Sequence, residues 1–144
     1  MVDVTRKSDV YREATATGFI KLRRETIELI RSGRVEKGNV IDASSIASLL
    51  GVKKTPDLLP LTHNIPITGV ETRLSVEDEG VRVYVTVKTT AKTGVEMEAL
   101  MGVAVALLNI WDMVKKYEKD SEEQYPETMI TDIKVVSKIK SEKG

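Results

Sequence analysis

The sequence contains no cysteine, and this absence excludes a disulfide framework, a thiolate metal site and a nucleophilic thiol. Aromatic residues are scarce, at 4% of the chain, so aliphatic side chains and methionine must fill the hydrophobic core. The same scarcity counts against single-stranded RNA binding, which uses aromatic side chains as stacking platforms. Neither thiol chemistry nor an aromatic surface therefore carries the function.

The sequence also has no excess of charge, with 22 basic and 22 acidic residues. No global field draws it to nucleic acid or to an anionic membrane, so any anion site must come from local convergence of cations. Its longest apolar run, VAVALLNIW from Val103, is about half of the roughly 20 residues that a membrane span needs. The N-terminal sequence is polar and lacks the apolar core of a secretory signal. We therefore expect a soluble, cytoplasmic protein with neither a nucleic-acid nor a membrane partner.

The length of 144 residues and the lack of a linker predict a single domain over residues 1–144. Period-two alternation predicts strands over residues 12–20, 67–76, 81–89 and 129–139. Helical spacing predicts helices over residues 22–32, 42–51 and 95–117, with a proline-rich loop over residues 53–66. This order predicts an α+β fold in which a ferredoxin-like antiparallel sheet has helices packed on one face.

Residues at the ends of the predicted helices act as start and stop signals. Gly33 is well placed to cap the first helix, Asp42 can cap the start of the second, and Gly51 is expected to close it. Thr93 or Gly94 can cap the start of the long third helix. These signals set the expected element boundaries.

The segment LPLTHN contains the only histidine, His63, in a proline-bounded loop. Histidine changes its charge near neutral pH and can hydrogen-bond a polar ligand. A functional role and a structural hydrogen bond are equally good interpretations of this residue taken alone.

The segment TGVEMEAL places Glu96 and Glu98 in the first turn of the long helix. Carboxylates there are favoured by the helix dipole, which is sufficient reason for their presence in an arbitrary protein. Free backbone donors at a helix start can also receive a ligand. Beside two carboxylates, that ligand would offer donors of its own, as the amino and amide groups of a pterin or guanine do.

The segment IWDMVKK places Asp112 three and four residues before Lys115 and Lys116. One interpretation is an ordinary helical ion pair, worth a few tenths of a kcal/mol. The other is a carboxylate and an ammonium that exchange protons with a substrate. Because Asp112 follows an apolar stretch between Trp111 and Met113, we expect partial burial that tunes its proton affinity.

Helix geometry separates two of these carboxylates. Glu98 and Asp112 are 14 positions apart, which puts them within about 40° around the helix but roughly 21 Å apart along it. Either the site is elongated, as a nucleoside triphosphate would need, or two subunits share it. We therefore expect an oligomer with sites at its interfaces.

Five lysines beside loops or segment ends could converge on phosphates, although most lysines only solvate a surface: Lys37, Lys53, Lys54, Lys92 and Lys115.

Together, the segments MVDVTRKSDVYREA, RVEKGNV, KKTPDLLPLTHN, KTGVEMEAL and IWDMVKK resemble the cyclic pyranopterin monophosphate synthase family, the C protein of molybdenum cofactor biosynthesis. The resemblance covers nearly the whole chain. It implies a lyase that converts cyclised dihydro-GTP to cyclic pyranopterin monophosphate and releases pyrophosphate. It also implies ferredoxin-like subunits in a hexamer, a trimer of dimers with each site at a subunit interface.

The resemblance also implies roles for particular residues. Asp112 matches the family's proposed catalytic acid/base, and Lys37 and Lys115 match its essential lysines. No tightly bound cofactor or metal site is implied, although Mg²⁺ could arrive with the substrate triphosphate. The positions expected to bind substrate are Leu61, Thr62, His63, Met97 and Glu98, with Arg12 and Lys53 near the phosphates and Glu96 in the site without an assigned role.

Two features depart from the family's pattern. Asn64 stands where many members have proline, and the sequence ends in SKIKSEKG in place of a glycine- and lysine-rich tail. Asn64 in place of proline could change the backbone of its loop. The different C-terminal sequence puts in doubt any phosphate contact from the tail. A non-catalytic nucleotide-binding oligomer of the same fold is the alternative, and the presence of Lys37, Asp112 and Lys115 together counts against it.

Overall fold

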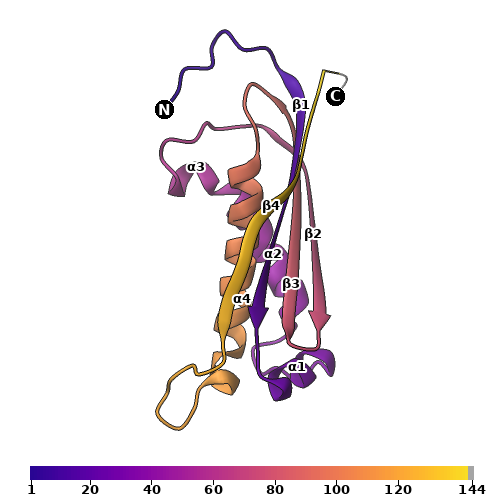
Figure 1. The fold of residues 1–144 in the computed structure, drawn as a ribbon, viewed down its shortest axis with the longest axis vertical. Helices are drawn as coiled ribbons and strands as arrows, with labels where there is room; N and C mark the ends of the chain where they lie inside the picture. Colours follow the sequence, from indigo (N-terminus) through magenta and orange to yellow (C-terminus); the bar gives the residue numbers. More distant parts are fainter. Residues whose placement is uncertain (143–144) are drawn as a thin grey trace.

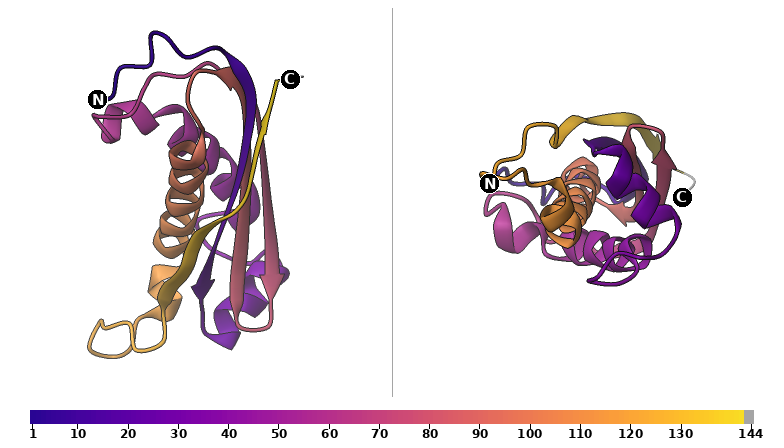
Figure 2. Two further views of the ribbon diagram at one scale, coloured as in Figure 1. Left: turned by 45° about the horizontal axis from the view of Figure 1, so that its top comes forward. Right: turned by 90° about the horizontal axis from the view of Figure 1, so that it is seen from below.

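A computed structural model describes residues 1–142 of the chain. Four strands form one antiparallel sheet in the order β2-β3-β1-β4, with helices packed on it (Figure 1 and Figure 2). The arrangement is ferredoxin-like, so the predicted α+β class is confirmed. Lys143 and Gly144, which end the divergent C-terminal sequence, lie outside the described residues. The elements are β1 (Val10–Lys21), α1 (Arg24–Arg31), α2 (Val40–Lys53), α3 (Thr55–Leu58), β2 (Ile67–Glu77), β3 (Gly80–Ala91), α4 (Glu96–Glu118) and β4 (Met129–Ser141).

The sheet buries one face because its central strands alternate. Every second residue from Val81 to Val87 in β3 is a valine with 0% exposure, as period-two alternation requires. On neighbouring β1, an added Cβ at Gly18 would lie 2.7 Å from Val103 Cγ1 and 2.8 Å from Leu107 Cδ1. The absence of a side chain at Gly18 therefore lets α4 lie directly on the sheet.

The longest helix, α4, packs along the sheet and against α2 (Figure 1). Its length and composition would allow it to cross a membrane, but 50% of its most apolar window is buried inside the molecule. Burial of one face against a sheet and a second helix is typical of a core helix in a soluble protein.

The end of α1 follows the sequence prediction. Gly33 has a φ of 68°, and its N–H donates to the carbonyl of Ile30 at 3.2 Å. The Arg34 N–H donates to the carbonyl of Leu29 at 2.9 Å, which completes a Schellman motif. This cap turns the chain into the segment that carries Lys37.

Both predicted ends of α2 are wrong. The helix begins at Val40, because the side chain of Asn39 accepts a hydrogen bond from the Asp42 N–H and caps the start itself. It also continues through Gly51, where an added Cβ would lie 2.8 Å from the carbonyl oxygen of Met101 on α4. Glycine serves here for the close crossing of two helices and does not end one.

Two further boundaries differ from the prediction. The proline-rich loop contains the four-residue helix α3, which has Pro56 in its first turn, where no backbone donor is needed. The N-cap of α4 is Val95, without a side-chain hydrogen bond, and not Thr93 or Gly94. Tertiary packing around the buried Val95 therefore sets this helix start.

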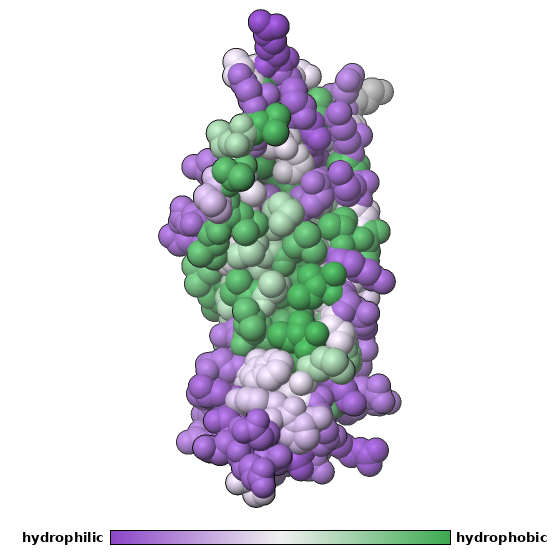
Figure 3. Space-filling model, turned by 60° about the vertical axis from the view of Figure 1, so that its left-hand side comes forward, coloured by the Kyte–Doolittle hydropathy of each residue, from purple (hydrophilic) through white to green (hydrophobic). Residues whose placement is uncertain are grey.

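Hydrophobic side chains are also exposed on one face of the molecule, where Figure 3 shows them gathered midway along its length. Apolar groups that gather on a surface mark a contact site more often than scattered ones do. We call four of the exposed apolar residues of the two long helices the α2/α4 apolar face: Ile46 (64% exposed), Leu49 (38%), Leu50 (53%) and Leu108 (60%).

Candidate active site

Three of the predicted site residues meet near the C-terminal end of α4. Asp112 and Lys115 lie one turn apart on the helix, and Lys37 reaches them from the segment between α1 and α2. Lys37 Nζ lies 3.1 Å from Asp112 Oδ2, and Lys115 Nζ lies 3.3 Å from Asp112 Oδ1. Lys37 Nζ also donates to the backbone carbonyl of Asp112 at 3.2 Å. One carboxylate is thus held by two ammonium groups, and we call these three residues the Asp112 cluster.

The charges in the cluster control the proton affinity of Asp112. The hydrogen bond from Lys37, followed by that from Lys115, lowers the pKa of the Asp112 carboxyl below its ordinary value. The Asp112 side chain is 56% exposed, so the expectation of partial burial between Trp111 and Met113 is wrong for the protomer. The neighbouring cations therefore outweigh burial, which acts on this pKa in the opposite direction.

The Asp112 cluster faces a surface hollow of about 360 Å³. Three lysines and two carboxylates surround it, which leaves a local excess of positive charge suited to an anionic ligand. The lining residues are Glu36, Lys37, Asp112, Met113, Lys115 and Lys116.

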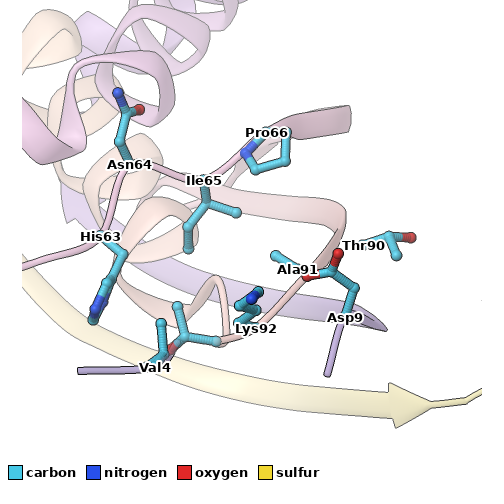
Figure 4. Close-up of a pocket in the computed structure, with 10 residues that line it drawn as sticks. Val4, Asp9, His63, Asn64, Ile65, Pro66, Thr90, Ala91 and Lys92 are labelled. Carbon is cyan, nitrogen blue, oxygen red and sulfur yellow. The ribbon is translucent and has the colours of Figure 1, made fainter. Parts of the chain in front are cut away.

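His63 lies near the other end of the molecule, beside a pocket of about 250 Å³ (Figure 4). Its Nε2 is 2.6 Å from the backbone carbonyl oxygen of Val2, so the N-terminal segment passes beside the ring. Lys92 Nζ donates to the carbonyl of Thr5 at 3.2 Å, which holds the same segment. Asn64 also lines this pocket, and Figure 4 shows its side chain turned away from the other labelled residues.

The two predicted glutamates at the start of α4 have different environments. Glu98 is 4% exposed, and burial, reinforced by nearby Glu96, raises the pKa of the Glu98 carboxyl above its ordinary value. Glu96 Oε1 lies 3.4 Å from Lys138 Nζ on β4. Between them, Met97 is 42% exposed. The helix start therefore offers one buried carboxyl and one ion-paired carboxylate.

The remaining predicted residues lie on β1, at the end of α2 and in the segment after α3, and Figure 1 shows α3 near the start of α4. Arg12 donates from Nε and Nη2 to the backbone carbonyls of Ala91, the last residue of β3, and Lys92, each at 3.4 Å. Thr62 Oγ1 donates to the Leu59 carbonyl at 2.7 Å, and Leu61 is 71% exposed. Lys53 is the exposed last residue of α2.

The structure therefore divides the predicted site into two groups. The Asp112 cluster lies toward the C-terminal end of α4, and the residues around His63, Glu98 and Arg12, which we call the His63 group, lie toward its N-terminal end (Figure 1). Because α4 is one continuous helix from Glu96 to Glu118, the rise of a helix keeps Glu98 and Asp112 roughly 21 Å apart along it. A single protomer does not bring the two groups together.

Comparison with known proteins bears on what both groups are for. A family model described as the MoaC family matches residues 1–141. The chain belongs to this family. Three curated relatives, each named "Probable cyclic pyranopterin monophosphate synthase", are similar along almost their full length. The protein of Aeropyrum pernix is 61% identical over 140 residues, covering 97% of this chain and 96% of that protein.

The other two relatives are comparably similar. The protein of Archaeoglobus fulgidus is 57% identical over 143 residues (99% of this chain, 92% of that protein), and the protein of Pyrococcus furiosus is 56% identical over 144 residues (100% and 92%). The resemblance drawn from the sequence segments is thereby confirmed. These names do not favour a non-catalytic nucleotide-binding oligomer.

Within this MoaC-family fold, sequence reasoning missed part of the Asp112 end. Lys116, expected to pair with Asp112, instead forms an ion pair with Glu36, which lies 80 residues away in the sequence. The hydroxyl of Tyr117 accepts a hydrogen bond from the Glu36 N–H at 2.9 Å. Both contacts join segments distant in sequence, so helical spacing gave no signal for them.

Proposed function

We propose that this chain is a cyclic pyranopterin monophosphate synthase, a lyase of molybdenum cofactor biosynthesis. It converts cyclised dihydro-GTP to cyclic pyranopterin monophosphate and releases pyrophosphate. The observation that carries the proposal is the Asp112 cluster, a carboxylate between two lysines beside a positively charged hollow in a MoaC-family chain. That arrangement supplies both a proton carrier and counter-charge for phosphates.

Substrate phosphates would change the chemistry of this cluster. In the free protomer Lys37 and Lys115 hold Asp112 ionised and weakly basic. Phosphate oxygens compete for the same ammonium groups, and each hydrogen bond withdrawn from Asp112 raises its proton affinity. Binding the triphosphate would therefore turn Asp112 into a better general base while the lysines neutralise charge on the departing pyrophosphate.

The groups at the other end of α4 would bind the organic part of the substrate. The carboxyl groups of Glu96 and Glu98 can accept hydrogen bonds from the amino and amide groups of the purine. His63 and Arg12 would exchange their present backbone partners for polar groups of the ligand. Any Mg²⁺ would come with the triphosphate; within residues 1–142 no group of three or more His, Cys, Asp or Glu side chains could hold a metal ion.

We further propose that the protein is a cytoplasmic homo-oligomer, a hexamer built as a trimer of dimers, in which the Asp112 cluster of one subunit meets the His63 group of another. Two observations support this. The two groups lie far apart on one protomer, and the α2/α4 apolar face between the ends of the molecule is exposed. A second copy covering that face would bury apolar area and complete the site.

The function is tested by incubating the purified protein with cyclised dihydro-GTP and measuring pyrophosphate and pterin product together, with GTP as the control substrate. Equal amounts of both products from the cyclised substrate alone are expected. Release of pyrophosphate from GTP at a similar rate, or no product from either nucleotide, would reject the proposed reaction.

Assembly is tested by sedimentation velocity on Leu108→Glu, with Leu58→Glu as the matched control because both leucines are 60% exposed. A carboxylate on the α2/α4 apolar face should split the oligomer, since burying an unpaired charge is costly. Leu58→Glu on α3 should sediment as the unsubstituted protein does. A monomeric starting protein with full activity would end the proposal of shared sites.

A further inference from the structure

Lys37 is carried by a tight turn of four residues, 35–38. The Gly38 N–H donates to the Val35 carbonyl at 3.1 Å, which leaves Glu36 and Lys37 at the two central positions. Val35 is 6% exposed and anchors one side of the turn in the core, while Gly38 has a φ of 116°, in the region that favours glycine. The turn thus has a fixed base and an exposed tip that ends in a lysine.

Two side chains of α4 hold the tip of this turn. The Glu36 N–H donates to the Tyr117 hydroxyl oxygen at 2.9 Å, and Lys116 Nζ pairs with the Glu36 carboxylate. Tyr117 is itself fixed, because its ring packs against the core and its backbone carbonyl accepts a hydrogen bond from Arg23 Nη1 at 3.1 Å. The last turn of α4 therefore presents a rigid acceptor to the backbone beside Lys37.

We propose that Tyr117 is a positioning residue for Lys37: its hydroxyl docks the 35–38 turn onto α4 and thereby sets the Lys37 ammonium on Asp112. A lysine side chain is long and flexible, and that of Lys37 is 48% exposed, so its own packing does not fix its position. Its reach depends on where the backbone of the turn lies. This inference rests on the proposed function for its kinetic consequence but not for its geometry.

Tyr117 does not line the hollow beside the Asp112 cluster, so it has no direct role in binding there. Its hydroxyl reaches the cluster through the turn, and its ring, which lies under Lys116 Nζ at 5.4 Å, would keep that contact as phenylalanine. Replacing Tyr117 by phenylalanine removes one oxygen atom, keeps the packed ring, and leaves the Glu36 N–H to water. The predicted effect is therefore a loosened turn in a folded protein.

The kinetic test compares Tyr117→Phe with Tyr84→Phe, a tyrosine on β3 whose ring stacks under Arg73 and would keep that contact as phenylalanine. We expect kcat/KM of Tyr117→Phe to fall by about two- to tenfold, the change that one lost hydrogen bond gives, mainly through a higher KM. The melting temperature should stay near that of Tyr84→Phe. In a Lys37→Ala background the same change should have almost no further effect, because the side chain to be positioned is gone. If the loss of kcat/KM in the double variant equals the product of the two single losses, the inference is overturned.

A second measurement does not require turnover. Carbon-13 NMR of the carboxyl groups follows the titration of Asp112, which is faced by Lys37 and Lys115 with Glu36 and Lys116 around the same hollow. Loosening Lys37 should raise the pKa of Asp112 in Tyr117→Phe, in the same direction as in Lys37→Ala and by less, with no change in Tyr84→Phe. An unchanged Asp112 titration in folded Tyr117→Phe would reject the positioning role even if the enzyme is active. A protein inactive on the cyclised substrate would reject the proposed function, and this titration would still decide the role of Tyr117.

Discussion

The two ends of α4 differ in how their polar groups are satisfied. At the Asp112 end, two ammonium groups share one half-exposed carboxylate, so each lysine can change partner when an anion arrives. At the His63 end, the groups are engaged with the protein's own backbone or buried: His63 with Val2, Arg12 with backbone carbonyls, and Glu98 in the interior. An anion could therefore bind at the first end by exchanging partners, whereas a ligand at the second end would have to displace internal contacts first.

The same contrast appears in two carboxyl groups on one helix. Neighbouring cations lower the pKa of Asp112, and burial raises the pKa of Glu98. Titratable groups whose environments push their pKa values apart are the usual basis for separate acid and base roles. If a partner subunit brings these ends together, one site holds a carboxylate that accepts protons and a carboxyl that retains one more readily.

The largest effect should come from Asp112→Asn, which removes the proton acceptor and keeps the shape. Turnover should fall by about 10²- to 10⁴-fold, the usual contribution of a general acid or base, while substrate affinity changes only modestly. Steady-state kinetics measures the change in turnover, and calorimetry measures the change in substrate affinity. Asp78→Asn is the matched control, because Asp78 forms an exposed ion pair with Arg31 and neither residue lines the hollow beside the Asp112 cluster. Retained turnover in Asp112→Asn would leave the Asp112 end with a purely electrostatic role.

Sharing of one site by both ends is tested by complementation between two defective variants. Asp112→Asn and His63→Ala should each be strongly impaired alone. If each site takes one group from each of two subunits, co-expressed mixed oligomers should regain on the order of one quarter of the normal sites. Mixing the same variants after separate purification, without subunit exchange, gives the baseline. Activity no higher than that baseline would assign all functional groups to a single subunit.

Sequence patterns predicted the parts of this molecule that depend on near neighbours. The valines of β3 alternate because one face of the sheet is buried, and Gly33 follows α1 because a Schellman cap needs a positive φ. The separation of Glu98 from Asp112 followed from the rise of one helix. All three are local properties that a single segment encodes.

What the patterns missed depends on distant segments. Glycine often ends a helix, which is why the pattern predicts a helix end at Gly51, but Gly51 lies where α2 crosses α4. Helical spacing predicts that Lys116 pairs with Asp112, whereas its partner is Glu36 from another segment. The docking of the 35–38 turn on Tyr117 is likewise invisible in the sequence. The approach of elements to one another decides such contacts, and no single segment specifies it.

A smaller effect, on binding and turnover alike, is expected from Lys37→Ala at the Asp112 end. Loss of one ammonium from a phosphate site should reduce kcat/KM by about 10- to 100-fold, the equivalent of one charged hydrogen bond. Because Lys37 is the main cause of the low pKa of Asp112, its removal should raise that pKa and move the acidic limb of the pH–rate profile to higher pH. Lys134→Ala, an exposed lysine on β4, is the control. If the acidic limb of the pH–rate profile does not move in Lys37→Ala, Lys37 does not control the group whose titration limits the rate.

The smallest effect concerns stability at the His63 end. Burial raises the pKa of Glu98 above its unfolded value, so the folded state binds its proton more tightly and loses that contribution as pH rises through the folded pKa. Glu98→Gln, which is neutral at every pH, should therefore raise the melting temperature by a few degrees at pH 8 and leave it unchanged below the ordinary pKa of glutamate. Glu96→Gln is the control, because it removes an ion pair with Lys138 and should give no such gain. An equal shift for Glu98→Gln at both pH values would mean that Glu98 is charged in the folded protein as readily as in the unfolded chain, and the contrast between the two ends of α4 would then rest on Asp112 alone.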